Sequence, residues 1–300
     1  MTRKPRISLI SAPFGLGAGR AGSEQAPDYL IQLGLTSRLL QLGCNIDEMR
    51  KLDRSGMAAP SIQVPMNHAV EVLKMGVALA EAVETAVTAG RFPFVLGGDH
   101  SLAMGTLAGL TARHRKLGVI WIDAHADMNT ESTSPSGNMH GIPLAVALGR
   151  AQLSLSHLLP GAGTVAPGNI VLIGARDLDP PEEALIWAEG ITCYGVADIR
   201  RQGMASIVAQ ALNQAGLGMD GIHLSFDIDS IDPSEAPGTG TPVQRGLTAD
   251  EAREALRLLA SSAALCSAEF VEVNPLLDRN DQTSKLAIEL IALFLSNLAI

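Results

Sequence analysis

The chain has 300 residues, of which 47% are hydrophobic and only 3% aromatic, so the sequence predicts a sizeable core built mainly from Ala, Val, Ile and Leu. Its formal net charge of −9 argues against nucleic acid or an anionic membrane surface as the main partner. Its three cysteines, Cys44, Cys193 and Cys266, lie far apart and form no CxxC pair, which argues against a disulfide framework and favours a reducing compartment.

The first half of the chain alternates two hydrophobic patterns. Short apolar runs rich in β-branched residues predict strands, and apolar residues repeating about every 3.6 positions predict helices. Glycine- or proline-containing stretches predict loops at Pro13–Gly22 and Asp53–Pro65. Strands are expected at Arg6–Ala12, Cys44–Met49, Phe92–Leu96 and Gly118–Ile122, and helices at Leu30–Leu42, Met66–Ala89, Leu102–Lys116 and Gly141–Leu148.

The second half continues this alternation to the C-terminus. Thr248, with Glu251 three residues later, has the spacing of a capping box and predicts a helix start. The last apolar stretch, Leu286–Ile300, is interrupted by Glu289 and is too short to span a bilayer, so we expect a packed helix and a cytoplasmic protein. Strands are expected at Asn169–Ile173, Ile191–Tyr194, Gly221–Phe226 and Ala268–Val273, and helices at Pro181–Glu189, Val196–Ala215, Thr248–Ser261 and Thr283–Ala299.

This alternation, with short connections, no internal repeat and no linker, predicts an α/β fold. We expect one domain over residues 1–300, with three α/β/α layers around a mostly parallel sheet of about eight strands. In open sheets of this kind, ligands bind at the carboxyl ends of the strands. Polar residues that directly follow predicted strands are therefore candidate site residues.

The most informative stretch is Trp121–Gly141, in which a buried strand ends in three potential metal ligands. If the extended backbone persists, Asp123, His125 and Asp127 point to one side, because side chains alternate along a strand. Three such groups are costly to bury together without a cation. The alternative interpretation of this pattern alone is a solvated turn that caps backbone groups.

Two further strand ends carry similar residues. Asp99 and His100 follow one strand, and Asp227 and Asp229 repeat the two-residue spacing after another. Asp232 precedes Pro233 in a predicted turn and is interpreted as structural. Carboxylates and imidazoles without thiolates suit Mn²⁺, Mg²⁺ or Fe²⁺, with Zn²⁺ possible. Four carboxylates balance two divalent ions, which favours a pair of metals that activates a water molecule.

The remaining histidines carry different expectations. His140 follows a polar loop after the first acidic cluster, and we expect it to donate a proton to the leaving group. His223 shares a strand face with Asp227 but lies four residues earlier, so a hydrogen-bonded core histidine is favoured over a ligand. His68, His114 and His157 have no acidic neighbours at ligand spacing and are interpreted as surface or packing residues.

Six motifs, in this order along the chain, resemble those of the ureohydrolase (arginase/agmatinase) family. The resemblance is closest to arginases, particularly the bacterial ones, and spans residues 97–275. The motifs are GGDHS (97–101), DAHADMNT (123–130), SPSGNMHG (134–141), SFDIDSIDP (225–233), GTGTPVQRGLT (238–248) and EFVEVNP (269–275).

This resemblance implies two Mn²⁺ ions per chain. All six ligand positions of the family are filled, with Asp123 and Asp227 bridging the two ions. One ion would be held by His100, Asp123, Asp127 and Asp227, and the other by His125, Asp123, Asp227 and Asp229.

The resemblance also implies how L-arginine is held. Glu272 would pair with the substrate guanidinium, and Thr241 would lie beside it. Asp179 and Glu182 would hold the α-amino group, directly or through water. Without the family, these two acids would be interpreted as caps of the helix that begins near Pro180. The α-carboxylate would be bound by Asn129, Ser134, Ser136 and Asn138.

The implied reaction is hydrolysis of L-arginine to L-ornithine and urea by a metal-bridging hydroxide. Asp127 would carry a proton to the departing amine, and His140 would exchange a proton with solvent. The rival functions are an agmatinase or guanidino-acid hydrolase, an amide hydrolase of the related deacetylase fold, and a noncatalytic metal-binding relative. The loop from Asn129 to Asn138 disfavours agmatine, which has no α-carboxylate.

The family resemblance also implies a homo-oligomer, a trimer or a hexamer. One residue departs from the family pattern: Asp250 stands where the family often has an Arg that forms an ion pair between subunits. The assembly is therefore a weaker expectation than the chemistry.

Overall fold

Eight strands form one sheet in a computed structural model that describes residues 4–53 and 58–299. Every strand pairing in these residues is parallel, and the strand order is β2-β1-β3-β8-β7-β4-β5-β6. The strands are β1 (Arg6–Ala12), β2 (Asn45–Lys51), β3 (Phe92–Gly97), β4 (Leu117–Ile122), β5 (Ile170–Ile173), β6 (Thr192–Tyr194), β7 (Gly221–Asp227) and β8 (Leu265–Val271).

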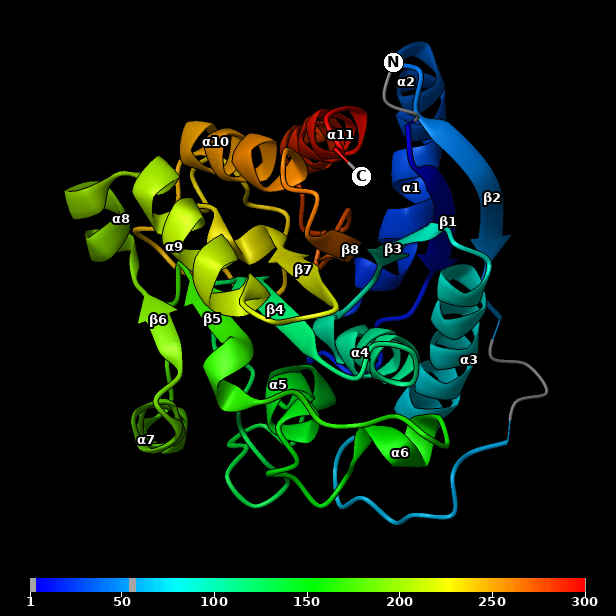
Figure 1. Cartoon of the computed structure of the whole chain (residues 1–300), viewed down its shortest axis with the longest axis vertical. Helices are drawn as coiled ribbons and strands as arrows, with labels where there is room; N and C mark the ends of the chain where they lie inside the picture. Colours follow the sequence, from blue (N-terminus) through cyan, green and yellow to red (C-terminus); the bar gives the residue numbers. More distant parts are fainter. Residues whose placement is uncertain (1–3, 54–57, 300) are drawn as a thin grey trace.

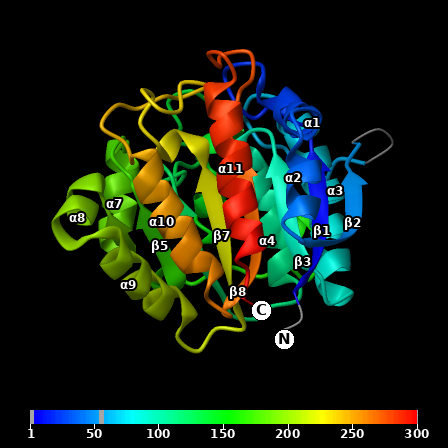
Figure 2. The ribbon, with the colours of Figure 1, turned by 90° about the horizontal axis from the view of Figure 1, so that it is seen from above.

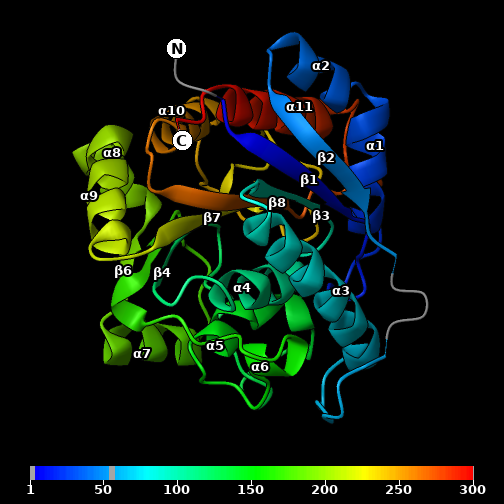
Figure 3. The ribbon, with the colours of Figure 1, turned by 45° about the vertical axis from the view of Figure 1, so that its right-hand side comes forward.

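Helices cover both faces of this sheet, as the chain-order alternation of strand and helix predicts (Figure 1). One layer contains α1 (Ala26–Gln32), α2 (Leu35–Gln41), α8 (Val196–Gln202), α9 (Met204–Gly216), α10 (Ala249–Ala260) and α11 (Gln282–Ser296). The other contains α3 (Ala69–Thr88), α4 (Ala103–Thr111), α5 (Pro143–Ala147), α6 (Leu155–Leu158) and α7 (Pro180–Glu189). Figure 3 shows α3 and α4 on the opposite side of the sheet from α10 and α11. The three-layer α/β/α prediction is confirmed.

The centre of the sheet brings together strands that are far apart in the chain. Strands β3, β8, β7 and β4 are consecutive neighbours, and Figure 2 shows α10 and α11 lying across β7 and β8. Since all four strands run parallel, their carboxyl ends meet at one edge. Each of these strands leads directly into one of the polar motifs described above. This arrangement places the candidate site residues beside one another.

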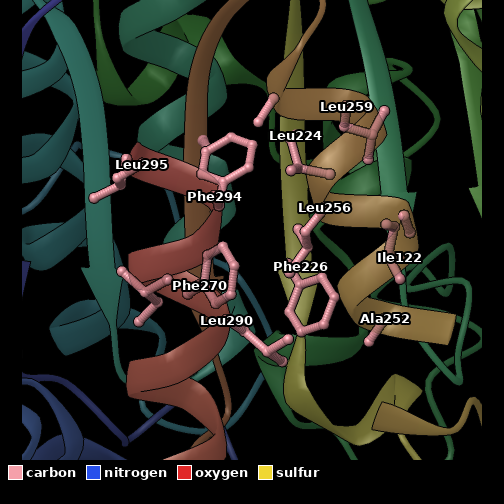
Figure 4. Close-up of a cluster of buried hydrophobic side chains, with 14 of the residues drawn as sticks. Ile122, Leu224, Phe226, Ala252, Leu256, Leu259, Phe270, Leu290, Phe294 and Leu295 are labelled. Atoms are coloured by element: carbon pink, nitrogen blue, oxygen red, sulfur yellow. The ribbon is translucent and has the colours of Figure 1, made fainter. Parts of the chain in front are cut away.

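The apolar core under α10 and α11 is built partly from aromatic rings (Figure 4). Phe226 on β7 and Phe270 on β8 stack with ring centroids 4.7 Å apart, and Phe294 of α11 lies 6.2 Å from Phe270. Few aromatic residues are present in the chain, but several are concentrated here. The remaining core is aliphatic, as the composition predicts.

Two predicted long helices are wrong because glycines divide them. The predicted helix Leu30–Leu42 is α1 and α2, separated at Gly34, which has φ of 103°. The predicted helix Val196–Ala215 is α8 and α9, separated at Gly203 with φ of 84°. Residues with a side chain rarely adopt this left-handed region, so each glycine permits a change of direction that hydrophobic spacing does not reveal.

Other boundaries differ by smaller amounts. Strand β8 begins at Leu265, three residues before the predicted start at Ala268, and α4 ends at Thr111 rather than at Lys116. The short helix α6 was not predicted. Strand β2 has little apolar content because it is an edge strand with mostly exposed side chains. Part of the predicted loop 53–65, residues 54–57, lies outside the described residues.

The predicted capping box is present at α10. Glu251 N–H donates to Thr248 Oγ1 at 3.1 Å, and Thr248 N–H donates to Glu251 Oε2 at 2.8 Å. Within residues 4–53 and 58–299, no helix combines the length and apolar character needed to cross a membrane.

Candidate metal centre and active site

The first cluster of candidate ligands is centred on His100, which follows β3 in a short 3-10 turn. Its Nδ1 atom lies 3.2 Å from Asp123 Oδ2, 3.1 Å from Asp127 Oδ2 and 3.1 Å from Asp227 Oδ2. All four side chains are buried. The exits of β3, β4 and β7 thus supply one compact group of three carboxylates around one imidazole.

The second cluster adjoins the first and shares Asp123. His125 Nδ1 lies 3.3 Å from Asp123 Oδ1 and 3.2 Å from Asp229 Oδ2. Because Asp123 contributes one carboxylate oxygen to each cluster, it lies where a bridging ligand would be needed. The structure therefore brings all six predicted ligand residues together, in two groups that could each hold a metal ion.

The hydrogen bonds behind His100 determine that its Nε2 atom is protonated. Glu269 is buried, but His223 and other hydrogen-bond donors outweigh burial and lower its pKa. It is therefore an ionised carboxylate, which only accepts hydrogen bonds. Ser225 Oγ donates to Glu269 Oε1 at 2.8 Å, and His100 Nε2 lies 2.8 Å from the same Ser225 Oγ. Since Ser225 has one hydroxyl proton, His100 Nε2 must carry a proton and donate it.

This tautomer tests whether the residues fit a cation. With the proton on Nε2, the lone pair of His100 Nδ1 faces three carboxylate oxygens, and Nδ1 has no hydrogen-bond partner. Lone pairs and negative charges at this distance repel one another unless a positive charge lies between them. In the metal-free chain a proton on Nδ1 can supply this charge, since the three aspartates outweigh burial and raise the pKa of His100 well above its usual value. A divalent cation would take the place of that proton. The site fits a cation, and its imidazole and carboxylate donors suit Mn²⁺ among other divalent ions.

Sequence reasoning missed the polar residues behind His100. Ser225 and Glu269 lie on β7 and β8, in register with each other, and Thr106 Oγ1 of α4 donates to Glu269 Oε2 at 2.6 Å. His223, also in this group, has Nδ1 2.8 Å from Ser267 Oγ and is a buried core histidine, as predicted. Alternating polar residues inside strands otherwise expected to be apolar were the available signal.

The carboxylates of the site have perturbed pKa values. Burial and the neighbouring Asp123 raise the pKa of Asp127 to about 6. Burial and the neighbouring aspartates raise the pKa of Asp227 well above its usual value. Burial would lower the pKa of His125, but Asp229 and Asp123 outweigh burial and raise it. The cluster therefore holds more negative charge than its surroundings neutralise, which is typical of a functional site.

Two of the predicted catalytic residues have strained backbones. Asp127 has φ of 51° and Glu272 has φ of 64°, both in the left-handed region that residues with a side chain rarely occupy. Glu272 N–H donates to Gly98 O at 2.7 Å, and Leu144 N–H donates to Asp127 O at 2.9 Å, so neighbouring segments hold both residues in place. Such strain concentrates at active sites.

The partly exposed His140 and the buried Glu272 form an ion pair. His140 Nδ1 lies 3.1 Å from Glu272 Oε1, which also accepts the His100 N–H at 2.8 Å. Burial would lower the pKa of His140, but the hydrogen bond and charge of Glu272 outweigh burial and raise it to about 9. At neutral pH His140 is therefore an imidazolium, the form that can donate a proton.

A cavity of about 220 Å³ opens beside both ligand clusters. A second cavity, of about 570 Å³, adjoins it. Glu272 lines neither of them, since it is 2% exposed and lies against His140. Asn138 lines only the second cavity. The other predicted substrate-binding residues line the first, namely Asn129, Ser134, Ser136, Asp179, Glu182 and Thr241.

The two predicted contacts to the α-amino group differ in how they are bonded. Glu182 uses both carboxylate oxygens on backbone donors: Asp179 N–H at 2.9 Å and Met128 N–H at 2.9 Å. It therefore caps α7 and ties that helix to the loop after β4. Asp179 Oδ2 accepts from Asn129 Nδ2 at 2.8 Å. The capping alternative is thus realised for Glu182, and the substrate roles of both acids stay predictions.

One further residue at the cavity, Asp177, was not predicted, whereas Asp99, a candidate from the strand ends, lines neither cavity. Asp177 lines both cavities, and its Oδ2 lies 3.9 Å from His125 Nε2. Asp99 is fully buried and accepts the Gly17 N–H at 2.7 Å, which anchors the glycine-rich loop after β1. The Gly17 carbonyl in turn accepts the His140 N–H at 3.1 Å. Asp99 follows β3, as the sequence indicated, but belongs to neither ligand cluster, and no pattern distinguished Asp177 from an ordinary turn residue.

Comparisons with known proteins agree with this geometry. A model of the arginase family matches residues 5–296. Arginases from Brevibacillus brevis and Bacillus subtilis are 42% and 41% identical, each over 95% of this chain and 96% of the relative. A crystal structure of Bacillus caldovelox arginase has a TM-score of 0.88 at 40% identity, covering 97% of this chain and 98% of its own. Entamoeba histolytica arginase in complex with L-ornithine has a TM-score of 0.86 at 31% identity, covering 98% and 99%. The chain belongs to the arginase family.

Proposed function

We propose that this chain is a dimanganese enzyme that hydrolyses L-arginine to L-ornithine and urea. Relatives more than 40% identical over nearly the whole chain are arginases, and the site offers two groups of imidazole and carboxylate ligands. The observation that carries the proposal is that His100 Nδ1 faces three carboxylates at 3.1 to 3.2 Å, which calls for a positive charge between them. Divalent cations bound there lower the pKa of water so that it becomes a nucleophile near neutral pH.

In this proposal the two ligand groups hold one ion each. His100, Asp127, Asp123 and Asp227 hold the first, while His125, Asp229, Asp123 and Asp227 hold the second. Mn²⁺ is the proposed ion, supported by the absence of thiolates and the dominance of carboxylate oxygens among the ligands.

The loop after β4 is proposed to bind the α-carboxylate of the substrate. Ser134 Oγ accepts the Gly137 N–H at 3.1 Å, and Ser136 Oγ accepts the Asn138 N–H at 3.2 Å. A hydroxyl that accepts a backbone hydrogen bond still has its own proton to donate. These two donors, with Asn129 and Asn138, support recognition of a carboxylate and disfavour agmatine. Asp179 and Glu182 are proposed to hold the α-amino group, directly or through water.

The proton movements are assigned to residues beside the ligand clusters. Asp127 takes a proton from the attacking water and passes it to the departing amine. His140 exchanges a proton with solvent through the cavity that it lines. Glu272 pairs with the substrate guanidinium near Thr241, which requires it to exchange part of its contact with His140 for the substrate. Water adds across the C–N bond, giving urea and the free amine of L-ornithine.

A two-substrate assay tests this function. The Mn²⁺-loaded chain is given L-arginine and agmatine side by side, and urea release is measured with each. We expect a preference of at least tenfold in kcat/KM for L-arginine. A preference for agmatine would identify an agmatinase, and no urea from either substrate with two ions bound would identify a noncatalytic relative.

The proposal includes a homo-oligomer, a trimer or a hexamer, in the cytoplasm. The Asp250 side chain is 92% exposed and lies 2.7 Å from Arg253 of the same chain. Its exposure supports the proposal that this surface could contact a partner subunit. Three unpaired cysteines support a reducing compartment. Light scattering of the purified chain measures the assembly, and cell fractionation measures the location.

A further inference from the structure

Arg176, in the loop after β5, directs its whole guanidinium at backbone carbonyl groups. A guanidinium has five N–H donors, and here each has an acceptor within 3.2 Å. Nε donates to Gln244 O at 3.2 Å, Nη1 to Gly174 O at 3.2 Å and Ser230 O at 3.1 Å, and Nη2 to Asp229 O and Val243 O, both at 2.8 Å.

These acceptors join separate parts of the site. Asp229 and Ser230 follow β7, and Val243 and Gln244 belong to the segment 238–248 that carries Thr241. The main chain of Arg176 adds a further link, because its N–H donates to Ala124 O at 2.8 Å. Ala124 lies between the candidate ligands Asp123 and His125. A single residue thus ties the exits of β4, β5 and β7 to this segment.

The contacts of Arg176 are concentrated on one of the two ligand clusters. The Asp229 carboxylate lies 3.2 Å from His125 Nδ1 and accepts from Thr241 Oγ1 at 2.9 Å. Arg176 binds the carbonyl of the same Asp229 and the carbonyls two and three residues after Thr241. None of its hydrogen bonds reaches His100 or Asp227.

The segment that carries Gly246 packs tightly against the Arg176 guanidinium. A Cβ on Gly246 would lie 2.5 Å from the Asp232 backbone nitrogen and 2.7 Å from Arg176 Nη2, so glycine lets this segment pack against both. Lysine has three donors on a flexible chain and lacks the planar fork. It cannot satisfy five carbonyls in two segments at once.

We infer that Arg176 is a positioning residue that orients Asp229 and the Thr241 segment, so that the Asp123–His125–Asp229 cluster binds its ion tightly. The inference rests on the proposed function, since it takes that cluster as a metal site. Arg176 contacts neither substrate-binding side chains nor the carboxylate oxygens of the cluster. The site around His100 serves as an internal reference, because Arg176 makes no hydrogen bond to His100, Asp127 or Asp227.

The test is a calorimetric Mn²⁺ titration of the metal-free full chain and its R176K variant. We expect the affinity of one site to fall 10–100-fold, which is the usual effect of losing a residue that orients a ligand, while the other site stays within about threefold of the wild type. Electron paramagnetic resonance of the loaded chain gives an independent readout. The spin-coupled pair of the wild type is expected to give way to isolated Mn²⁺ in R176K at limiting metal.

R200K is the matched control. Arg200 Nη2 donates one hydrogen bond, at 3.1 Å, to the carbonyl of Gly246 in the same segment, and its side chain is half-exposed. Because Arg200 does not contact Asp229, both affinities are expected to match the wild type in R200K.

Equal weakening of both sites in R176K, or a change of less than threefold in both, would overturn the inference. If circular dichroism shows that R176K does not fold, R176Q is titrated by the same criteria, and failure of both to fold would show a general structural role instead. The titration does not depend on turnover. A wild-type chain that binds two ions without releasing urea would refute the proposed function alone.

Discussion

The two faces of β7 and β8 are both buried but carry different residues. On the face toward α10 and α11, Phe226 and Phe270 stack within the apolar core (Figure 4). On the other face, Ser225 and Glu269 lie in register and hydrogen-bond behind His100. Apolar contacts stabilise without direction, whereas buried polar groups must each find a partner of correct geometry. The first face therefore supplies stability, and the second orients the site.

Removing one of the candidate metal-ligand carboxylates is expected to have the largest effect. In Asp127→Ala or Asp229→Ala, urea release from L-arginine is expected to fall at least about a thousandfold, because bound cations supply several kcal/mol of transition-state stabilisation. Urea assays and elemental analysis measure rate and metal content. Asp220→Ala is the control, since Asp220 directly precedes β7 at the end of the strand away from the site, where its exposed Oδ2 accepts the Lys116 N–H. Wild-type rate and metal content in both ligand variants would refute the assignment.

Truncating the apolar face is expected to lower stability rather than chemistry. Phe226→Ala removes a fully buried ring and is expected to lower the free energy of unfolding by about 4 kcal/mol. Urea denaturation measures this loss, with Leu217→Ala at a 76% exposed position as the control. The KM for L-arginine and the affinity for Mn²⁺ are expected to be unchanged in the folded fraction. A large change in either would mean that the two faces are not functionally separate.

The ion pair of His140 and Glu272 is expected to make the stability of the metal-free chain depend on pH. The folded-state pKa of His140, about 9, is above its unfolded value of about 6.5. The pair's contribution is therefore complete below pH 6.5 and is lost as the pH rises to 9. From the pKa difference it amounts to about 3 kcal/mol. The unfolding free energies of the wild type and His140→Gln are compared at pH 6 and pH 10, and a difference independent of pH would contradict this.

The smallest expected effect sharpens the comparison directly. Glu269→Gln removes the acceptor-only carboxylate that fixes the direction of the Ser225 and His100 hydrogen bonds. We expect the affinity for Mn²⁺ to fall about 10–100-fold, as is usual when the groups behind a ligand change. Calorimetric titration measures this, with Phe226→Ala on the opposite face of the neighbouring strand as the control. Equal affinities in both variants would show that the polar face has no orienting role.

Local patterns predicted the strands and the ligand motifs closely, because both depend on residues near one another in the chain. Asp123, His125 and Asp127 follow a strand at two-residue spacing, and this required no knowledge of the fold. The helices were predicted less well where Gly34 and Gly203 change the backbone direction inside apolar patterns. A glycine can continue a helix or end it, and the choice depends on what the next segment packs against.

The sequence by itself determined the alternating α/β order, the buried strands and the chemistry at their ends. Only the tertiary structure decided that β8 lies between β3 and β7, which places Glu269 behind His100 and Glu272 beside His140. It also decided which carbonyl groups surround Arg176. The physical reason is that side-chain alternation and helical spacing are local, whereas strand order joins residues more than a hundred positions apart and follows from how the layers pack.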